Sequence, residues 1–345
     1  MMGVATTLIG LLPTYASIGV LAPLMLVLLR FVQGLAIGGQ WGGAMLLVTE
    51  NAPVEKRGWY GAYAQAGAPV GVILANLAFL GVSAGLTEEE FMDWGWRLPF
   101  IASFVLIIIS MYVQLKLEDT PAFKALAESK AENPDEASGL EKSPVAEVIR
   151  RYPKRIVLAA GAFLSIQVTF YILIAFIVAY GVNSPTVELS RDVMLTAVLI
   201  AAAIMVPTQF YFSGLSDRIG RKRVYQWGAI LTGFWGFALF PLIDTGNPYA
   251  IVLAVSLGLV FLGMQYGPQA AFFTELFSTE VRYSGASLGY QLGAIVGGAL
   301  APTIAVLLWN NFGIFYVSLY IALAAALTLL SLSALTETQG KDLTE

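Results

Sequence analysis

The chain has 345 residues, of which 57% are apolar and 12% are charged, with a formal net charge of −4 and a mean hydropathy of +0.74. This composition excludes an ordinary soluble globular domain, in which about a quarter of the residues are charged. Cysteine and histidine are both absent, which excludes disulfides, thiolate or imidazole metal sites and imidazole proton relays. We therefore expect an all-α protein that lies in a lipid bilayer.

Apolar runs long enough to cross the hydrocarbon, roughly 17 to 25 residues each, recur along the whole chain. Ten helical spans are predicted, at 2–17, 20–49, 59–83, 98–115, 156–182, 193–213, 224–243, 248–273, 285–309 and 312–334. The first is the least regular, because Pro13 interrupts it and no polar residue precedes it. Residues 1–20 contain no charge, which argues against a secretory signal peptide.

The basic residues indicate how the chain lies in the membrane. Of the 19 lysines and arginines, sixteen fall on one side of the alternating map of spans. Two, Arg97 and Arg191, fall on the other side, and Arg30 lies inside a span. Because short loops rich in Lys and Arg stay in the cytoplasm, we expect the first side and both chain ends to be cytoplasmic.

An internal repeat relates two parts of the chain. TENAPVEKR at residues 49–57 matches TELFSTEVR at residues 274–282 at an offset of 225, and Gln65, Gly67 and Gly71 are echoed 226 positions later by Gln291, Gly293 and Gly297. We interpret this as a duplication. At that offset the first copy would begin about seventy residues before Met1, so the chain is predicted to be ten spans of a twelve-span protein with two six-span halves. An internal start site, a split gene or a trimmed chain would each account for this.

The loop between the sixth and seventh predicted spans, GLSDRIGRKR at residues 214–223, is the most specific feature. Gly214 and Gly220 allow a tight turn and close helix approach, and Asp217 is suited to accept hydrogen bonds from helix N-terminal amides. The basic side chains that anchor the membrane face are Arg218, Arg221, Lys222 and Arg223. From these residues alone, a fixed topology anchor and a moving gate are equally open interpretations.

Arg30 lies near the middle of a predicted span, where a guanidinium costs about 2.5 to 3.5 kcal/mol on insertion scales. At helical spacing its face includes Gln33, Gln40 and Trp41. A buried arginine bonded to carbonyls of a neighbouring helix is one interpretation. We favour a role in anion binding or in tuning a nearby acid.

Polar side chains also recur at helical spacing on other spans. They are Gln65 and Asn76 on the third span, Gln167 and Tyr171 on the fifth, Gln265, Tyr266 and Gln269 on the eighth, and Gln291, which repeats the Gln65 position. Amides and phenols in hydrocarbon must find partners. For any one of them, a bond that holds helices together is the better interpretation, whereas the set predicts a cavity for a small hydrogen-bonding solute.

Residues 214–223 resemble the cytoplasmic loop motif of the major facilitator superfamily. Further segments resemble its metabolite:proton symporter branch, namely RFVQGLAIGGQWGG at 30–43, WGWRLPF at 94–100, EDTPAF at 118–123, YGPQAAFFTELF at 266–277 and VRYSGASLGYQ at 281–291. That branch includes carriers of shikimate, α-ketoglutarate, citrate and proline or betaine. The resemblance covers almost the whole chain apart from residues 124–150.

The resemblance implies a multi-pass transporter of the bacterial inner membrane that moves a small organic solute by alternating access, with a proton as the coupling ion. It also implies a monomer without cofactor, metal or nucleic acid. In the family the loop motif holds the outward-open state by pairing with a neighbouring helix end, here expected at Arg282–Gly285. The implied gating residues are Gly214, Asp217, Arg218, Gly220, Arg221, Arg223 and Arg282.

We expect an N-terminal half at residues 1–117, equivalent to helices 3–6, and a C-terminal half at 155–335, equivalent to helices 7–12. A cytoplasmic linker at 118–154 joins them, and a tail follows at 336–345. No carboxylate lies at the middle of a span, and Gln40 stands where related sequences usually have glutamate. Proton coupling is therefore implied by the resemblance alone.

Two alternatives to a working carrier stay open on the sequence. An enzyme would need a catalytic cluster, and without Cys, His or a buried pair of acids none is predicted. A truncated fragment that no longer transports would carry the same motifs. As for the solute, Arg30 favours an organic acid such as shikimate or a dicarboxylate over a zwitterion such as proline or betaine.

Overall fold

The computed structural model describes residues 1–38, 40–116, 144–184, 187, 189–277 and 282–340. All regular secondary structure in these residues is helical, which confirms the predicted all-α class. Contacts between residues divide the chain into two compact units. Unit 1 comprises Met1–Trp41 and Leu74–Lys124, and unit 2 comprises Gly42–Ile73 and Ala125–Glu345.

Within the described ranges, eight helices are long and apolar enough to cross a membrane. They are Leu21–Glu50, Val54–Gly85, Pro153–Asn183, Arg191–Ile219, Arg221–Ile243, Pro248–Thr274, Arg282–Phe312 and Ile314–Ala334. The pair Glu88–Gly95 and Arg97–Val113, bent by 41°, gives a ninth if it forms one span. These helices correspond to nine of the ten predicted spans, as expected for a multi-pass membrane protein.

The first predicted span, residues 2–17, is not one long helix. Helix α1 covers Met2–Gly10, the chain then turns, and a second short helix, α2, covers Tyr15–Ile18. Nine residues at 1.5 Å each extend only about 14 Å, roughly half of the hydrocarbon thickness. The interruption surrounds Pro13, which has no backbone N–H to donate and restricts the residue before it.

Unit 1 is built around α1. This helix packs against α3 (Leu21–Ile37), α8 (Arg97–Ala102) and α9 (Phe104–Lys116). The unit also contains the second part of α6 (Gly67–Gly85) and the short helix α7 (Glu88–Glu90). The Arg97 guanidinium donates from Nη1 to the carbonyls of Gly10 at 3.2 Å and Leu12 at 2.5 Å, so it satisfies acceptors at the end of α1 that the helix leaves open.

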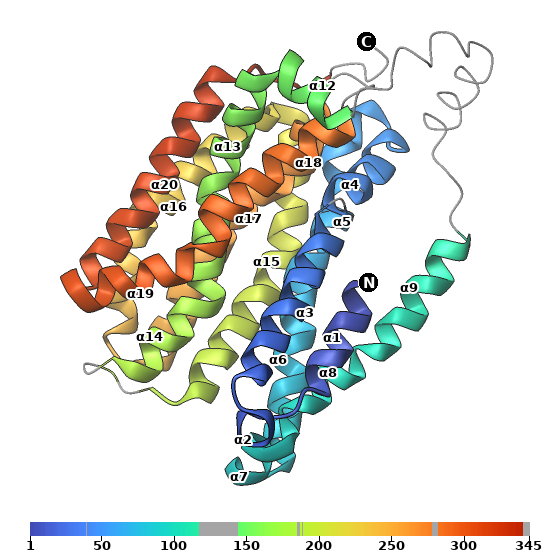
Figure 1. Cartoon of the computed structure of the whole chain (residues 1–345). Helices are drawn as coiled ribbons and strands as arrows, with labels where there is room; N and C mark the ends of the chain where they lie inside the picture. Colours follow the sequence, from blue (N-terminus) through green and yellow to red (C-terminus); the bar gives the residue numbers. More distant parts are fainter. Residues whose placement is uncertain (39, 117–143, 185–186, 188, 278–281, 341–345) are drawn as a thin grey trace. The chain divides into compact units, whose positions relative to one another are not determined.

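Unit 2 contains the longest helices (Figure 1). The α-helices that lie wholly in unit 2 are, in chain order, α5 (Arg57–Gln65), α12 (Pro144–Arg151), α13 (Pro153–Tyr171), α14 (Ile177–Asn183), α15 (Arg191–Ile219), α16 (Arg221–Ile243), α17 (Pro248–Thr274), α18 (Arg282–Gly293), α19 (Ala301–Phe312) and α20 (Ile314–Ala334). Most of α4 (Gln40–Glu50) and the first part of α6 also belong to it. The π-helical segments Ile172–Phe176 and Ala294–Ala299 join α13 to α14 and α18 to α19.

Helix starts in unit 2 follow local sequence signals. Ser190 precedes α15, and its hydroxyl accepts from the Val193 amide at 3.3 Å. Asn247 precedes α17 and accepts from the Tyr249 amide at 2.9 Å, with Pro248 in the first turn. These are the residue types that stabilise helix N-termini. Both helices begin within two residues of the spans predicted at 193–213 and 248–273.

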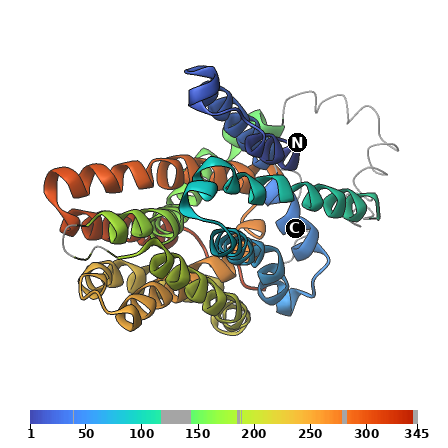
Figure 2. The same ribbon diagram turned by 90° about the horizontal axis from the view of Figure 1, so that it is seen from below.

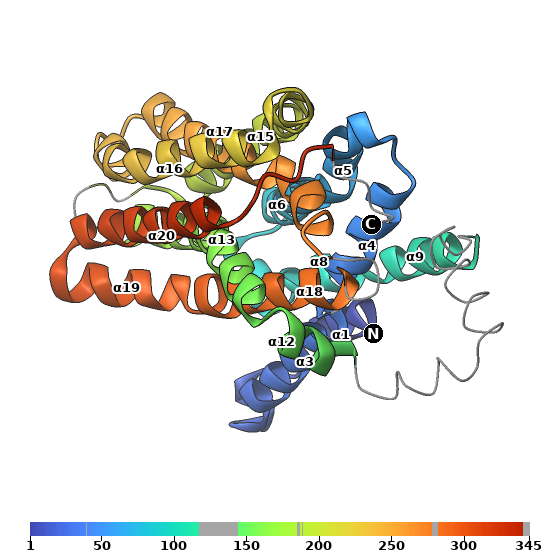
Figure 3. The same ribbon diagram turned by 90° about the horizontal axis from the view of Figure 1, so that it is seen from above.

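The core of unit 2 lies along α17, which contacts α5, α13, α15, α16 and α18. Seen along the helices from below and above (Figures 2 and 3), α15, α16 and α17 lie side by side. The rings of Phe163 on α13 and Phe273 on α17 stack with their centroids 4.1 Å apart. Because α17 is surrounded on most sides, the polar residues on it are positioned by several helices at once.

Candidate functional site

The loop motif forms the joint between α15 and α16. Gly220 lies between the two helices with φ +108°, a backbone conformation that glycine adopts without the strain a side chain would bring. A Cβ at this position would also come within 2.8 Å of Oε2 of Glu337. The joint places Asp217 in the last turn of α15 and Arg221 at the start of α16.

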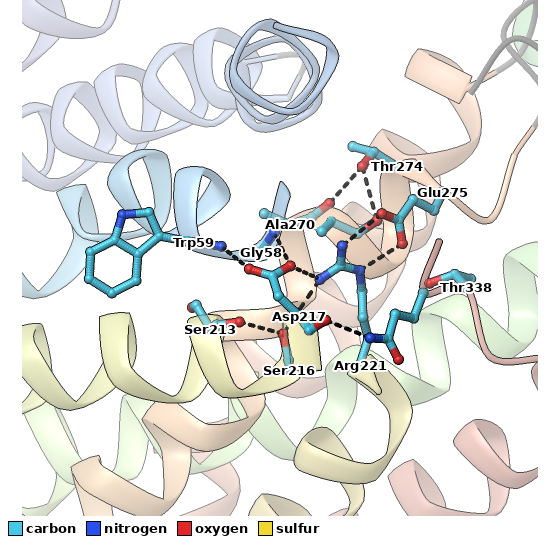
Figure 4. Close-up of polar contacts among 12 residues, drawn as sticks. Gly58, Trp59, Ser213, Ser216, Asp217, Arg221, Ala270, Thr274, Glu275 and Thr338 are labelled. Carbon is cyan, nitrogen blue, oxygen red and sulfur yellow. Dashed lines mark hydrogen bonds and ion pairs between the residues drawn. The ribbon is translucent and has the colours of Figure 1, made fainter. Parts of the chain in front are cut away.

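The Asp217 carboxylate binds the N-terminus of α5. Its Oδ1 accepts from the Gly58 amide at 2.8 Å and its Oδ2 accepts from the Trp59 amide at 2.9 Å (Figure 4). The first amides of a helix have no partner within the helix, and a negative charge there is favoured by the helix dipole, by up to about 2 kcal/mol when partly buried. Asp217 therefore caps α5 from a different helix.

Arg221 joins Asp217 to a second acid. Its Nη1 lies 2.8 Å from Oδ1 of Asp217, while its Nε and Nη2 lie 2.7 and 3.0 Å from the two oxygens of Glu275 (Figure 4). The arginine is 0% exposed, and a two-point arginine–carboxylate contact is among the strongest polar pairs. Burial raises the pKa of the Glu275 carboxyl above its ordinary value, and the Arg221 guanidinium opposes that shift.

Three further charged residues complete the site. Arg282 donates from Nε to the Phe277 carbonyl at 3.1 Å, and its Nη1 lies 3.5 Å from Oε1 of Glu50. Arg57 is 6% exposed, and its charge acts on both Glu275 and Arg282. We call the following six residues the charge cluster: Glu50, Arg57, Asp217, Arg221, Glu275 and Arg282. Its three acids and three bases compensate one another only while the helix ends that carry them stay together.

The prediction of the loop motif's partner was wrong in one respect. We predicted the segment Arg282–Gly285, but the described hydrogen bonds of the Asp217 carboxylate go to Gly58, Trp59 and Arg221. The repeat explains the difference, because an offset of 225 makes Arg57 the counterpart of Arg282. The motif contacts the other copy of the same element, while Arg282 joins the cluster through Glu50.

The remaining motif residues lie around this cluster. A Cβ at Gly214 would be 3.2 Å from the Trp59 ring, so α15 passes close to α5 at this point. Arg218 and Arg223 are exposed and form no hydrogen bond or ion pair with another described residue. They line a cavity of about 630 Å³ together with Ile219, Gly220, Lys222, Gln226, Glu337 and Gln339.

The structure brings together some of the polar residues predicted for a solute cavity in unit 2. Gln65, Gln265 and Gln269 are at most 1% exposed. Nε2 of Gln65 donates to Oε1 of Gln269 at 3.0 Å, whereas Nε2 of Gln265 donates to Thr232 at 2.7 Å. The Tyr266 carbonyl accepts from Gln65 at 3.0 Å. In the conformation described, these amides are bonded within the protein.

The other cavity candidates of unit 2 lie on α13 and α18. Gln167 is 6% exposed and hydrogen-bonds to Tyr290 on α18. Tyr171 ends α13 and is 38% exposed, and Gln291 on α18 is half-buried. Tyr171 and Gln291 are therefore less buried than the amides of α17, whereas Gln167 is itself buried.

In unit 1 the cavity candidates lie on α3 and at the start of α4. Arg30 is exposed, and its one hydrogen bond to another described residue joins Nη1 to Oε1 of Gln33 at 3.3 Å. Gln33 is 7% exposed and donates to the Thr6 hydroxyl at 2.6 Å. Gln40 is exposed and Trp41 is 8% exposed. The Arg30 side chain thus keeps most of its hydrogen-bonding capacity.

A family model described as Major Facilitator Superfamily matches residues 1–288. The chain belongs to the major facilitator superfamily. It is 41% identical over 350 residues to the inner membrane metabolite transport protein YhjE of Escherichia coli (strain K12), across 99% of this chain and 77% of that protein. The shikimate transporter of the same organism is 35% identical (97% and 75% covered), and its proline/betaine transporter is 31% identical (99% and 68% covered).

The fold of this facilitator is also found in solved structures. The proton:xylose symporter XylE bound to 6-bromo-6-deoxy-D-glucose superposes with a TM-score of 0.75 at 15% identity, over 100% of this chain and 81% of that one. At this identity the likeness concerns the fold alone. The family, the relatives and the fold are those of membrane transporters of metabolites, and not of enzymes.

Residues that follow α20 contact the loop motif at 214–223, which the sequence did not predict. The Glu337 carboxylate accepts from the backbone amides of Arg221 and Lys222, both at 3.1 Å. The Gln339 side chain donates to the Asp217 carbonyl at 2.5 Å. Glu337 therefore caps α16, in the position that a neighbouring serine or aspartate usually takes. Nothing in the local sequence pattern marks Glu337, because its partners lie more than a hundred residues earlier.

Replacing Glu337 by alanine should lower the stability of the facilitator by about 1 kcal/mol, because the first amides of α16 lose their acceptor and the helix dipole loses a favourable charge. The thermal unfolding midpoint of the protein in detergent, followed by tryptophan fluorescence, should fall by a few degrees. The exposed neighbour Thr336 offers the control, since Thr336→Ala removes no described contact. An unchanged midpoint for Glu337→Ala would contradict the assigned capping role.

Proposed function

We propose that this facilitator is a secondary active transporter that carries a small organic acid, such as shikimate or a dicarboxylate, together with protons across the bacterial inner membrane. The charge cluster is its cytoplasmic gate. The observation that carries this proposal is the double role of Asp217, which caps α5 and pairs with Arg221, while Arg221 in turn holds Glu275.

The helices that the cluster joins support a gating role. On the predicted division into halves, α5 belongs to the N-terminal half, whereas α15, α16 and α17 belong to the C-terminal half. Alternating access requires contacts between halves that form in one state and break in the other. Charges at helix ends suit this task, because water and counterions solvate them when the ends separate, so opening does not leave them buried and unpaired.

The exposed guanidinium of Arg30 supports an organic acid as the solute. A guanidinium matches the planar geometry of a carboxylate with two parallel hydrogen bonds, and Arg30 is bonded to no described acid. The shikimate transporter among the relatives, at 35% identity, carries an acid. A zwitterion of the proline or betaine kind is the second candidate, because the relative named for those solutes matches 99% of the chain at 31% identity.

The proposal is tested by uptake into proteoliposomes that contain the 345-residue chain under an imposed pH gradient. The panel consists of radiolabelled shikimate, α-ketoglutarate, proline and glycine betaine. We expect one of the acids to accumulate and the accumulation to collapse with a protonophore. Accumulation that ignores the protonophore would contradict proton coupling, preferential uptake of proline or betaine would contradict the solute class, and no uptake of any member would contradict transport by this chain.

Exchanging Asp217 for asparagine should reduce uptake at least tenfold without reducing the amount of protein inserted in the membrane. Asparagine keeps one acceptor oxygen but loses the charge that favours both the α5 N-terminus and Arg221. The matched control is Asp192→Asn, which removes an exposed acid at the other end of α15. Normal uptake by well-inserted Asp217→Asn would refute the gating role of the cluster.

A further inference from the structure

One face of α5 packs closely against α15 and α17 over two helical turns. Gly58, Gly61, Ala62 and Gln65 recur at the spacing of a single helix face and are all buried. The first of them, Gly58, meets Asp217 of the charge cluster. The others continue along the same helix toward its C-terminal end, so the contact does not stop at the cluster.

Small residues allow this close approach. A Cβ at Gly61 would lie 2.9 Å from the Cβ of Ala270 on α17, a distance at which one of the two helices must move. The Ala62 carbonyl accepts from Nε2 of Gln209 on α15 at 3.3 Å. The backbone of α5 is therefore in direct contact with both neighbouring helices beyond the charge cluster.

The far end of this face is closed by a buried amide contact. Nε2 of Gln65 donates to Oε1 of Gln269 and to the Tyr266 carbonyl, both at 3.0 Å. Gln65 is 1% exposed and Gln269 is 0% exposed. Gln269 reaches the Tyr225 phenol on α16 at 3.5 Å, and Tyr225 donates to the Ala162 carbonyl on α13 at 2.7 Å. The contact thus links α5 to three helices of unit 2.

From Gly58 to Gln65 the helix advances seven residues, or about 10 Å at 1.5 Å per residue. We infer that the proposed gate has a second and deeper layer, formed by Gln65, Gln209 and Gln269 and here named the amide layer. The amide layer separates and re-forms in every transport cycle. This inference rests on the proposed function. It moves Gln65 and Gln269 from the group of solute contacts to the closure of the pathway. Gln265, which is bonded to Thr232, also leaves that group and becomes a contact within one half.

The chemistry of the amide layer suits a contact that opens repeatedly. A neutral amide exchanges a protein partner for water with little net change in free energy, whereas a buried ion pair at this depth would leave costly unpaired charges during opening. The structure also contains a comparable amide bond within one predicted half, from Gln265 on α17 to Thr232 on α16 at 2.7 Å. That bond joins helices of the same half and should persist through the cycle.

Because the chain contains no cysteine, paired cysteines test this difference directly. The variant Gln65→Cys/Gln269→Cys is joined with a short bifunctional thiol reagent that is cleaved by reduction, and Gln265→Cys/Thr232→Cys is treated in the same way as the matched control. Uptake of the radiolabelled panel of shikimate, α-ketoglutarate, proline and glycine betaine is then measured before linking, after linking and after reduction.

We expect linking of positions 65 and 269 to reduce uptake at least tenfold and reduction to restore it, while linking of positions 265 and 232 changes uptake less than twofold. Uptake that persists after complete linking of positions 65 and 269 would overturn the inference, because the two helices would then not need to separate. Equal inhibition by both links would also overturn it, since the effect would not be specific to the amide layer.

A second measurement keeps the inference testable if the unlinked protein shows no uptake, which would contradict the proposed function itself. A single cysteine at Ala270, which is 0% exposed beside Gly61, is labelled in inverted membrane vesicles with a membrane-impermeant maleimide. Gln65→Ala should raise the labelling rate at least threefold, whereas Thr232→Val should not. An unchanged rate with Gln65→Ala would overturn the inference independently of transport.

Discussion

Arg221→Gln should abolish uptake and lower the thermal unfolding midpoint of the facilitator by on the order of 5 to 10 °C. The side chain is 0% exposed and is held by Asp217 and Glu275, so its removal takes away the base that both carboxylates contact directly. Breaking a buried ion pair from one side typically costs about 3 to 5 kcal/mol, which is a large part of the stability of most proteins. Uptake should be lost because the helix ends no longer attract one another.

The effect of Arg221→Gln can be separated from simple loss of positive charge. Arg223→Gln removes the same charge two residues away, from an exposed side chain that pairs with no other described residue. This change should alter the free energy of unfolding by less than about 0.5 kcal/mol. Adding Glu275→Gln to Arg221→Gln should recover part of the stability, because one of the two unpaired acids is removed. If Arg221→Gln had the same midpoint and uptake as the parent chain, the contacts of Arg221 with Asp217 and Glu275 would not be what holds the charge cluster together.

The spans could be predicted from the sequence because a bilayer imposes a minimum length on apolar helices. Residues 248–273 and 312–334 were predicted, and α17 and α20 have nearly these bounds. The exception is residues 2–17, where composition is apolar throughout but Pro13 interrupts the helix. Apolar content alone does not distinguish one long helix from two short ones, since that depends on where the backbone hydrogen bonds continue.

The candidate site was predicted in part. The charges of residues 214–223 stand out in an apolar chain, so Asp217 and Arg221 were found, but their pairing was not. A repeat offers two equivalent partners for the same motif, and only packing decides between Arg57–Tyr60 and Arg282–Gly285. Glu275 was not predicted as a partner of Arg221, because their contact spans 54 residues and leaves no periodic signal.

The polar stripes show a second limit of sequence reasoning. An amide on an apolar helix must find a partner, but the sequence does not say whether that partner is a solute or a neighbouring helix. Gln65 and Gln269 were predicted as cavity residues, and in the structure they bond to each other. Arg30 belongs to the same predicted cavity, yet its side chain stays exposed and bonds only to Gln33 among the described residues.

Gly58→Ala should have the second large effect, because the added methyl group destabilises the closed gate by steric overlap alone. The methyl group would come within 2.7 Å of Nη1 of Arg221 and Oδ1 of Asp217, and within 2.8 Å of the Ser213 carbonyl. Neither charged atom is free to move, because the two are paired with each other, and the carbonyl belongs to the backbone of α15. Overpacking of this kind costs about 1 to 3 kcal/mol, which would reduce the population of the closed state roughly 5- to 150-fold.

The consequence is a facilitator that folds but does not close on this side. Uptake should fall at least tenfold, and the maleimide labelling of a cysteine at Ala270 should rise, because the α5 face no longer covers α17. Gly67→Ala is the matched control, as a Cβ there meets nothing within 4 Å, and it should leave both readouts unchanged. If Gly58→Ala reduced uptake without raising the labelling, the variant would be impaired by some route other than an open gate, and the closure assigned to Asp217 and α5 would be wrong.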